Sequence, residues 1–504
     1  MTPRYSRWLV SLYNSPWTAV TLVAVVGFMG ALNHSMWRDE MNVWLIARDS
    51  PSFGALIENI HYDRAHPGLW HLLVAILEQL FDNPIAMQIF HWLLAVGSIL
   101  LIWQCSPFTQ TQKWLITFGH LPFYEHLLIA RNYAVAMLLL FTICAVWPSR
   151  KRAYWPLAIL LVLLANSNIY ALIIAIALAL TLGLELLFEA KLRRNWLDIG
   201  FSGLLIILGC AISLYFIVPP SDVADKALGE YFLTLDLRQL LKTIGRIFAG
   251  YYTIVPNGKR YLDLVVCAAL SLASCGLVLL HLARKPYAVA FYLFSNGAIL
   301  GFTYIKFMAY LMRHVGNIYL VLIAALWLAH HYPPSSLMPR RLPLIEPWIT
   351  QSRRWFKRML IAVLITHLAG GLYGFTRDML VPYSASRAAA AYMREANLQD
   401  AFIVASRDAQ MAPLSGLLRR PFYYPERQML GSYTLFFKGD RREVSQPEVL
   451  QQVSTLLSEQ PQILLILTKE LEIPAPGLVI EPIQSFTQSW TNEEYYLYWV
   501  SAAQ

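Results

Sequence analysis

Two adjacent carboxylates, Asp39 and Glu40, directly follow the first apolar run of the sequence. Neighbouring acidic residues point in different directions on a helix or a loop, so one can face a site while the other pairs with Arg38 or Arg48. A carboxylate beside a desolvated, positively charged cavity can act as a general base toward a hydroxyl group. A solvated helix cap explains an isolated Asp-Glu pair more simply, so the pair becomes informative only through the residues that accompany it.

Histidines gather at the end of the same polar segment, where His61, Asp63, His66 and His71 lie close together. Histidine and carboxylate side chains are common metal ligands, so the group invites a metal interpretation. However, the three histidines are spaced by five residues, which does not place all of them on one helix face, and Pro67 interrupts helical geometry. No metal ligand is assigned, and a divalent cation stays open as a cofactor.

Two arginines, Arg131 and Arg313, open later apolar runs, and Tyr133 and His314 accompany them. Arginine binds phosphate through two parallel hydrogen bonds, so two arginines on one cavity would suit a lipid phosphate headgroup. The alternative is that each arginine only reaches toward the headgroups of the surrounding bilayer.

The elements that must position these residues are membrane helices. The chain is 57% hydrophobic and only 14% charged, with a mean hydropathy of +0.46, whereas soluble domains have about 25% charged residues. The first apolar run, 16–36, lacks a small-residue cleavage site and is interpreted as an uncleaved anchor. The further apolar runs of spanning or near-spanning length are 67–81, 84–104, 131–148, 154–165, 168–188, 198–218, 261–283, 286–311, 315–331 and 359–381.

The net charge of +9 comes mainly from short basic clusters between these runs, so it indicates membrane orientation and argues against nucleic-acid binding. The clusters are Arg4/Arg7, Arg150 to Arg152, Lys191 to Arg194, Arg284-Lys285 and Arg340 to Arg358. The five cysteines have no CxxC spacing and lie in or beside apolar runs, which indicates packing and neither disulfides nor zinc.

The number of membrane crossings between the basic clusters predicts the orientation of the chain in the membrane. A weaker run, 113–130, contains His120, Pro122 and Glu125, which are unfavourable against lipid. If this run only half crosses the membrane, every basic cluster falls on the cytoplasmic side. The chain then makes about eleven crossings, with a cytoplasmic N-terminus and an extracytoplasmic C-terminus.

This topology gathers the candidate residues on the outer side of the cell (inner or plasma) membrane. It places there the segments 37–66 and 219–260, the turn around Arg131, the turn 166–168 and the pair Arg313-His314. The segment from Leu235 to Phe248 is amphipathic.

Residues 382–504 have the composition of a soluble domain, so the chain divides into a transmembrane domain, 1–381, and an extracytoplasmic α/β domain, 382–504. Residues 384–398 show a helical pattern, while 401–405 and 463–467 have the character of buried strands. Residues 494–500 are predicted as an edge strand. The predicted fold class is therefore a polytopic α-helical membrane protein with a small α/β soluble C-terminal domain on the outer side.

The order of the short motifs resembles the GT-C superfamily of membrane glycosyltransferases. Asp39-Glu40 follows the first helix, HPGLWHLL (66–73) begins the second, RNYAV (131–135) precedes a later one, and a soluble outer domain ends the chain. The pattern is similar to the protein-mannosyltransferase and aminoarabinose-transferase branch, including bacterial relatives of unassigned acceptor. The resemblance covers about residues 10–381, and it departs from the usual His-Pro-Pro at Gly68 and in lacking a clear second catalytic acid in later loops.

The resemblance implies transfer of a sugar from a polyprenyl-phosphate-linked donor to an unknown glycan, lipid or protein acceptor on the non-cytoplasmic face. Asp39 would then be the general base, with Glu40 its alternate, and Arg131 and Arg313 would hold the phosphate leaving group. The remaining candidate residues, His61, Asp63, His66, Tyr133 and His314, would bind and position the substrates.

Two other classes of protein fit parts of the pattern. A multi-pass transporter or a flippase of lipid-linked sugars would also have many helices and an outer cavity, but charged residues are scarce at helix centres and no inverted repeat is visible. A membrane receptor that uses its C-terminal domain to bind a partner is the third.

Overall fold

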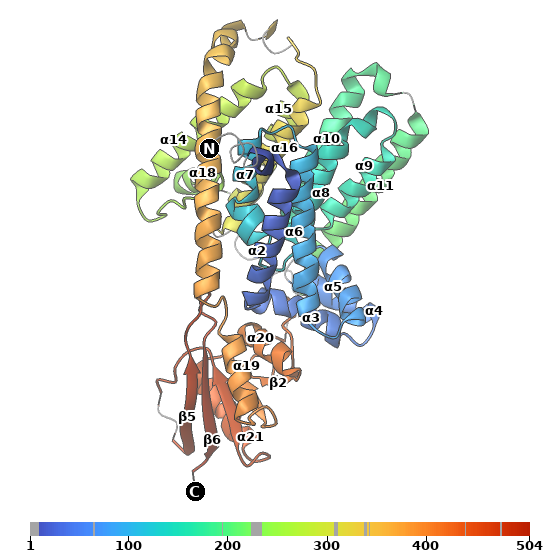
Figure 1. Ribbon diagram of the computed structural model, residues 1–504. Coiled ribbons are helices and arrows are strands. Elements are labelled where there is room, and N and C mark those ends of the chain that lie inside the picture. Colours follow the sequence, from blue (N-terminus) through green and yellow to red (C-terminus); the bar gives the residue numbers. More distant parts are fainter. Residues whose placement is uncertain are drawn as a thin grey trace.

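The computed structural model describes the chain except for residues 1–9, 64–65, 194, 223–233, 307–310, 337–339, 342, 439, 474–475 and 504. Within these described residues the order of the elements confirms the predicted class, a helical membrane protein with a small C-terminal sheet domain (Figure 1). The basic residues Arg4, Arg7 and Arg194 lie outside the described residues.

Nine helices of the described residues are long and apolar enough to cross a membrane. They are α2 (Pro16–Asn33), α6 (Ile85–Cys105), α8 (Tyr133–Val146, continued by a short turn to Lys151), α10 (Ile169–Phe188), α11 (Trp196–Ile217), α14 (Tyr261–Leu282), α15 (Pro286–Ile305), α16 (Met312–His330) and α18 (Glu346–Leu380). Two shorter apolar helices, α5 (Leu69–Leu80) and α9 (Trp155–Ala165), account for the two remaining predicted runs. Helices form here because lipid offers no partner for backbone polar groups, which must pair within the helix.

Helix α16 lies at the centre of the membrane part and is buried along nearly its whole length. It packs against α8, α10, α15 and α13 (Leu237–Tyr252), the helix formed by the amphipathic stretch predicted at 235–248. Its first turn carries Arg313, so the packing of α16 fixes the height of this arginine in the bundle.

The weak run 113–130 does not form a spanning helix. It consists of α7 (Gln110–Thr117) and a π-helical segment, η1 (His120–Glu125), which both pack against α18. A Cβ atom at Gly371 of α18 would lie 2.3 Å from the carbonyl oxygen of Phe118, so only glycine allows this close approach. The segment thereby brings the chain back to the end of the bundle where Arg131 lies.

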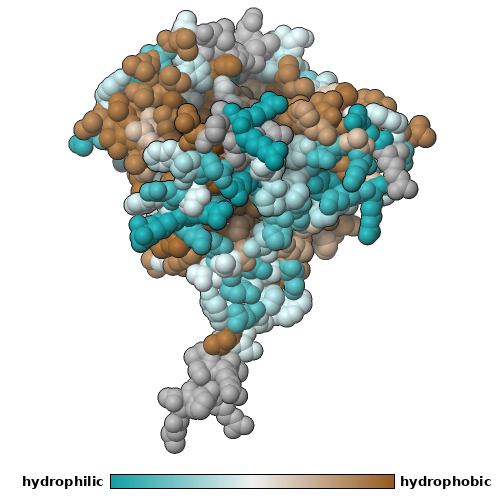
Figure 2. Space-filling model, turned by 90° about the horizontal axis from the view of Figure 1, so that it is seen from above, coloured by the Kyte–Doolittle hydropathy of each residue, from teal (hydrophilic) through white to brown (hydrophobic). Residues whose placement is uncertain are grey.

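The described basic clusters lie at the end of the bundle opposite the C-terminal domain. At that end Arg150 pairs with Glu185 of α10, and Arg284 pairs with Glu346 at the start of α18. Figure 2 looks onto this end and shows hydrophilic residues across its middle, with hydrophobic residues along both sides. The polar segment 37–66 lies at the other end, beside the C-terminal domain, and forms α3 (Arg38–Asp49) and α4 (Phe53–Tyr62) (Figure 1).

The C-terminal domain is a six-stranded sheet with the strand order β3-β2-β1-β4-β6-β5. Strand β1 is parallel to β2 and β4, while the other neighbours are antiparallel. The strands are β1 (Ile403–Ala405), β2 (Phe422–Tyr424), β3 (Met429–Gly431), β4 (Ile463–Leu467), β5 (Leu478–Phe486) and β6 (Tyr495–Ala502), and the helices are α19 (Ser386–Glu395), α20 (Asp408–Leu418) and α21 (Gln446–Leu456).

The prediction of an edge strand at 494–500 is wrong. Strand β6 lies inside the sheet, between β4 and β5, because the unpredicted strand β5 pairs along its outer side. Pro482 and the many exposed residues of β5 hid this strand in the sequence, although they suit an edge.

The C-terminal domain rests directly on α3. Helix α20 packs against α3, where a Cβ atom at Gly416 would lie 2.5 Å from the sulfur of Met41. Asn42 of α3 exchanges hydrogen bonds with the backbone of Thr434, and Arg387 donates to the carbonyl oxygen of His34. The helix that carries Asp39 is therefore held between the membrane part and the C-terminal domain.

Candidate functional site

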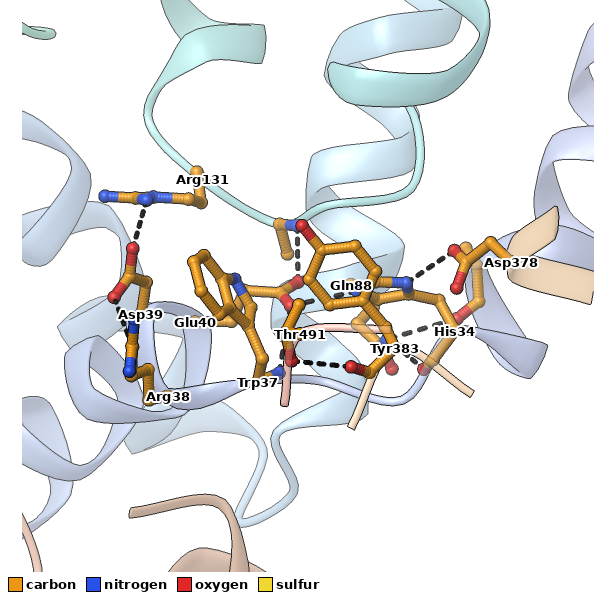
Figure 3. Close-up of polar contacts among 12 residues, drawn as sticks. His34, Trp37, Arg38, Asp39, Glu40, Gln88, Arg131, Asp378, Tyr383 and Thr491 are labelled. Carbon is orange, nitrogen blue, oxygen red and sulfur yellow. Dashed lines mark hydrogen bonds and ion pairs between the residues drawn. The ribbon is translucent and has the colours of Figure 1, made fainter. Parts of the chain in front are cut away.

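The site is built around Asp39, which occupies the first turn of α3. One oxygen of Asp39, Oδ2, accepts from Nη1 of Arg131 at 2.5 Å and lies 3.9 Å from Nη2 of Arg313. The other oxygen, Oδ1, lies 3.7 Å from Nε of Arg38. The structure thus brings together three residues predicted from the sequence: Asp39 from α3, Arg131 from just before α8, and Arg313 from the start of α16. Figure 3 shows the contact between Asp39 and Arg131.

The charges around Asp39 set its ionisation. Burial works against the carboxylate, but the guanidinium groups of Arg131, Arg313 and Arg38 outweigh burial and hold the pKa of Asp39 below its ordinary value of 3.8. The first turn of a helix also favours negative charge. Asp39 is therefore ionised at neutral pH and can receive a proton, and its side chain keeps 22% of its surface exposed.

Glu40 points away from the arginines and is fully buried. Its carboxylate accepts hydrogen bonds from the backbone of Trp37 at 3.2 Å and of Ala130 at 2.5 Å, and it contacts Nε2 of His34 at 2.9 Å. Figure 3 shows Asp39 directed toward Arg131 and Glu40 directed toward His34. Because Ala130 precedes Arg131, Glu40 fixes both the turn that carries Asp39 and the backbone beside Arg131. Of the two predicted acids, only Asp39 faces the arginines.

A second carboxylate completes this buried group. The ring of His34 lies between Glu40 and Asp378 of α18, with Nδ1 of His34 at 2.7 Å from Oδ2 of Asp378. Burial would lower the pKa of His34, but the two carboxylates outweigh it and raise the pKa to about 10. His34 is therefore an imidazolium at neutral pH that joins α3 to the end of α18.

Sequence reasoning missed His34 and Asp378. Two signals could have found them. His34 directly follows the first apolar run, and Asp378 is a lone carboxylate at the end of the last one, where an unpaired charge would be unfavourable.

The residues predicted at the end of segment 37–66 separate into two groups. His66 carries no charge at neutral pH, because burial, the largest effect, lowers its pKa to about 4. The charges of Asp63, Arg131 and Asp39 also act on its pKa, so the field of the Asp39 ion pair reaches His66. Asp63 is buried and contacts Nε2 of His71 at 3.0 Å, and the ring centres of His71 and His66 lie 6.3 Å apart.

His61 lies apart from the site. Its ring packs on Tyr215 with the centroids 4.4 Å apart, and its Nε2 lies 3.0 Å from the carbonyl oxygen of Val218. Within the described residues no group of three or more His, Cys, Asp or Glu side chains could hold a metal ion. The geometry here adds no support for a divalent cation.

Aromatic side chains enclose the two arginines. The guanidinium carbon of Arg131 lies 5.8 Å from the ring centre of Tyr133, and that of Arg313 lies 5.2 Å from the ring centre of Trp37. The ring of His314 lies 5.6 Å from that of Tyr170. These rings restrict the orientation of the cations and exclude water from them, which strengthens their attraction for an anion.

A further arginine lies deeper in the bundle. Arg246 of α13 is 1% exposed, and its charge acts on Tyr170 and His314. The sequence showed only that the stretch 235–248 is amphipathic, and the burial of a basic residue within it depends on the packing of α13 against α16.

Comparison with known proteins identifies the fold. The sequence matches no family model and no curated protein. Among solved structures, the chain is similar to ArnT from Cupriavidus metallidurans in the apo state, with a TM-score of 0.51, 12% identity, and coverage of 99% of this chain and 98% of that one. It is also similar to the same enzyme bound to undecaprenyl phosphate, with a TM-score of 0.44, 13% identity and 98% coverage of both chains. The first likeness shows that this chain has the fold of that protein, with a helical membrane part and a small C-terminal sheet domain.

Proposed function

We propose that this protein is an integral-membrane glycosyltransferase of the GT-C type, which moves a sugar from a polyprenyl-phosphate-linked donor to an acceptor on the non-cytoplasmic face. The observation that carries the proposal is the ion pair of Asp39 with Arg131, close to Arg313, within a GT-C fold. A base and two cations on one partly exposed site are the groups that such a transfer needs.

In the proposed reaction the oxygen of an acceptor hydroxyl attacks the anomeric carbon of the donor sugar. A new glycosidic bond forms while the bond between this carbon and the phosphate oxygen breaks, and polyprenyl phosphate leaves with both bonding electrons. Asp39 receives the hydroxyl proton. Arg131 and Arg313 stabilise the negative charge that develops on the departing phosphate, since fixed cations in a water-poor site favour the charge-separated transition state.

The geometry also supports a sequence of events. As long as Arg131 and Arg313 contact Asp39, its pKa stays low and it is a weak base. A donor phosphate that engages the two arginines would draw their charge away from Asp39 and raise its basicity. The site would therefore activate the acceptor only after the donor is bound.

The other candidate residues have subordinate roles in this proposal. His66, which is neutral and within the field of Asp39, can donate a hydrogen bond to a sugar hydroxyl or accept one from it. Tyr133 and His314 border the arginines and position the phosphate end of the donor. Asp63 holds His71 beside His66, and the position of His61 gives it no direct role in the chemistry.

The basic clusters support a cytoplasmic N-terminus and an extracytoplasmic C-terminal domain. They lie at the end of the bundle opposite this domain, and basic loops are retained in the cytoplasm. A phosphatase reporter fused behind the C-terminal domain should therefore be active, because it would lie outside the cytoplasm. A cytoplasmic signal from this fusion would overturn the proposed orientation of the site.

The transfer itself is tested with purified protein and a panel of polyprenyl-phosphate sugars. Loss of the base in Asp39→Asn should slow release of polyprenyl phosphate roughly 100-fold or more, and loss of the cation in Arg131→Ala should slow it by a similar factor of about 100. The matched controls are Asp82→Asn and Arg419→Ala, which remove the same groups from an exposed ion pair and should leave the rate unchanged. Equal rates in the folded wild type and both site variants would refute the assignment.

A further inference from the structure

A cavity of about 270 Å³ lies where the C-terminal domain meets α3. It opens at the carboxyl end of β1, where the chain passes through Ser406 and Arg407 into α20. Its wall includes Arg38, Arg407, Asp408, Gln410, Glu426 and Phe436. One wall therefore comes from the membrane part of the chain and the other from the sheet domain.

The topology of the sheet explains why a cavity forms at this place. Strand β1 lies between β2 and β4, and the connections from β1 to β2 and from β3 to β4 run in opposite directions across the sheet. Helix α20 covers one face, against Ile403 and Ala405, and α21 covers the other, against Val404. In such sheets the two helices diverge at the carboxyl end of the strands and leave a crevice, which is where α/β domains bind ligands.

The cavity contains a buried hydrogen-bond acceptor that no described residue satisfies. Glu426 is 3% exposed, and its Oε1 accepts from Oγ of Ser406 at 2.9 Å and from the backbone of Arg407 at 2.6 Å. Its other oxygen, Oε2, has no partner within the described part of the chain, and the same is true of Oε1 of Gln410. A buried unpaired acceptor is unfavourable, so a ligand that donates hydrogen bonds would relieve it.

The neighbouring carboxylate, that of Asp408, already has hydrogen-bond partners. Both oxygens of Asp408 accept from Arg441, each at 2.8 Å, so Asp408 does not compete for the ligand. The cavity lining carries three carboxylates, those of Asp408, Glu426 and Glu443, and three guanidinium groups, those of Arg38, Arg407 and Arg441, so its formal charges balance.

The backbone beside the cavity is strained at one residue. Arg407 has a φ of 67°, in the left-handed region that favours glycine, which costs about 1 kcal/mol or more for another residue. This conformation directs the N–H of Arg407 to Glu426 and leaves the side chain exposed beside the cavity. Such strain is common where the backbone is arranged around a ligand.

Arg38 connects the cavity to the proposed catalytic base. Its side chain lines the cavity, its Nε lies 3.7 Å from Oδ1 of Asp39, and its backbone N–H donates to Glu493 of the sheet domain at 3.1 Å. A ligand in the cavity would therefore contact Arg38, the residue that directly precedes the proposed base Asp39.

We propose that this cavity binds a carbohydrate unit of the acceptor and presents a hydroxyl group of the acceptor chain to Asp39. This inference rests on the proposed function. Sugar hydroxyls would donate to Glu426 and Gln410, and sugar oxygens would accept from Arg38 and Arg407. The volume lies just below the roughly 300 Å³ at which ligand pockets begin, which suits a single sugar ring better than a long segment.

The test measures binding of the labelled, full-length protein in detergent to an array of oligosaccharides made of neutral and amino sugars. Glu426→Gln removes the carboxylate, and Ala409→Trp fills the cavity from α20 with a ring, so that the test does not depend on the folding of one variant. Loss of a hydrogen bond to a charged group should weaken binding about tenfold or more in Glu426→Gln. Ala409→Trp should weaken binding at least as much, because its ring occupies the space of the ligand. Glu481→Gln, on the exposed face of β5, is the matched control and should bind as the wild type does.

Binding of polyprenyl phosphate by the same proteins separates this inference from the proposed function. The inference is supported if the wild type binds a carbohydrate and the two cavity variants lose only that binding. It is overturned if no carbohydrate binds, or if both variants bind as the wild type does, even when polyprenyl phosphate binding shows that the donor site is intact. A third outcome is that carbohydrate binding depends on the cavity while Asp39→Asn and Arg131→Ala leave the rate of polyprenyl phosphate release unchanged. In that case the carbohydrate site is supported and the proposed transfer reaction is refuted.

Discussion

Replacing His34 by glutamine should destabilise the protein in a way that depends on pH. In the wild type the charged ring of His34 lies between the carboxylates of Glu40 and Asp378, with contacts of 2.9 and 2.7 Å, and the ring of Tyr383 packs 5.0 Å away. All three polar groups are buried. His34→Gln keeps a polar side chain of similar length but removes the positive charge, so two buried carboxylates are left with no cation between them.

The size of the effect follows from the pKa of His34. This pKa rises from 6.5 to about 10 on folding, and a tenfold change in a protonation equilibrium is equivalent to about 1.4 kcal/mol. The proton on His34 therefore contributes about 5 kcal/mol to the free energy of unfolding when both states are protonated. Breaking a buried ion pair by removing one partner costs about 3 to 5 kcal/mol, which is a similar amount.

The sign of the pH dependence is fixed by the direction of the shift. The pKa of His34 is higher in the folded state than in the unfolded state. The His34 proton therefore makes its full contribution to the free energy of unfolding below pH 6.5, and this contribution is lost as the pH rises through about 10. The difference in free energy of unfolding between wild type and His34→Gln should therefore shrink by about 3 kcal/mol between about pH 6 and about pH 9. Equilibrium unfolding of both proteins in detergent with a denaturant, at a series of pH values, measures this difference.

A constant difference across this pH range would refute the reasoning, because it would mean that His34 is not protonated in the folded protein. A second variant locates the effect. Asp378→Asn removes one of the two carboxylates and should weaken the pH dependence without abolishing it, since Glu40 still contacts the ring. Sugar transfer by His34→Gln should fall even where the protein is folded, because Glu40 fixes Asp39 and the backbone next to Arg131.

Two further predictions concern the scaffold around the site. Gly371→Ala should lower the free energy of unfolding by about 1 to 3 kcal/mol in thermal unfolding, because the added Cβ meets the backbone of Phe118, whereas Gly276→Ala, with open space around it, should be neutral or slightly stabilising. Equal effects of the two substitutions would show that η1 and α18 do not approach closely. Arg150→Ala should lower the free energy of unfolding by about 3 to 5 kcal/mol through the loss of its buried ion pair with Glu185, at 2.7 Å, and should leave the affinity of the folded protein for the proposed donor unchanged. A change in substrate affinity would place this pair closer to the reaction than the structure does.

The membrane part could be predicted well from the sequence because lipid imposes a simple rule. Backbone groups in lipid must pair within a helix, so long apolar runs become helices with few exceptions. The exception, 113–130, was marked by Pro122 and Glu125 and indeed forms two short pieces, α7 and η1. The grouping of Asp39, Arg131 and Arg313 could be predicted for the same reason. Asp39 follows one apolar run and the two arginines open two others, and the predicted directions of these three helices place all three residues at the same membrane surface.

What could not be predicted depends on contacts between distant segments. His34 and Asp378 are 344 residues apart in the chain, and neither is informative until α2 and α18 are known to end side by side. The position of β6 depends on its pairing with β5, whose sequence has few apolar residues at regular spacing. The cavity between Arg38 and Glu426 requires both the sheet topology and the docking of the domain on α3.

The different roles of Asp39 and Glu40 follow from the first turn of α3. Two adjacent residues on a helix point about 100° apart, so one carboxylate cannot share the environment of the other. Glu40 is buried and held by His34 and the backbone of Ala130, which leaves it no freedom to move a proton. Asp39 instead contacts the guanidinium groups of Arg131 and Arg313, which could pair with a donor phosphate in its place. In the proposed mechanism, Asp39 becomes a strong base only after the donor phosphate has engaged the arginines, so the donor sugar would be protected from attack by water until the acceptor is in place. This protection would depend on Glu40 holding α3 rigid as much as on Asp39 itself.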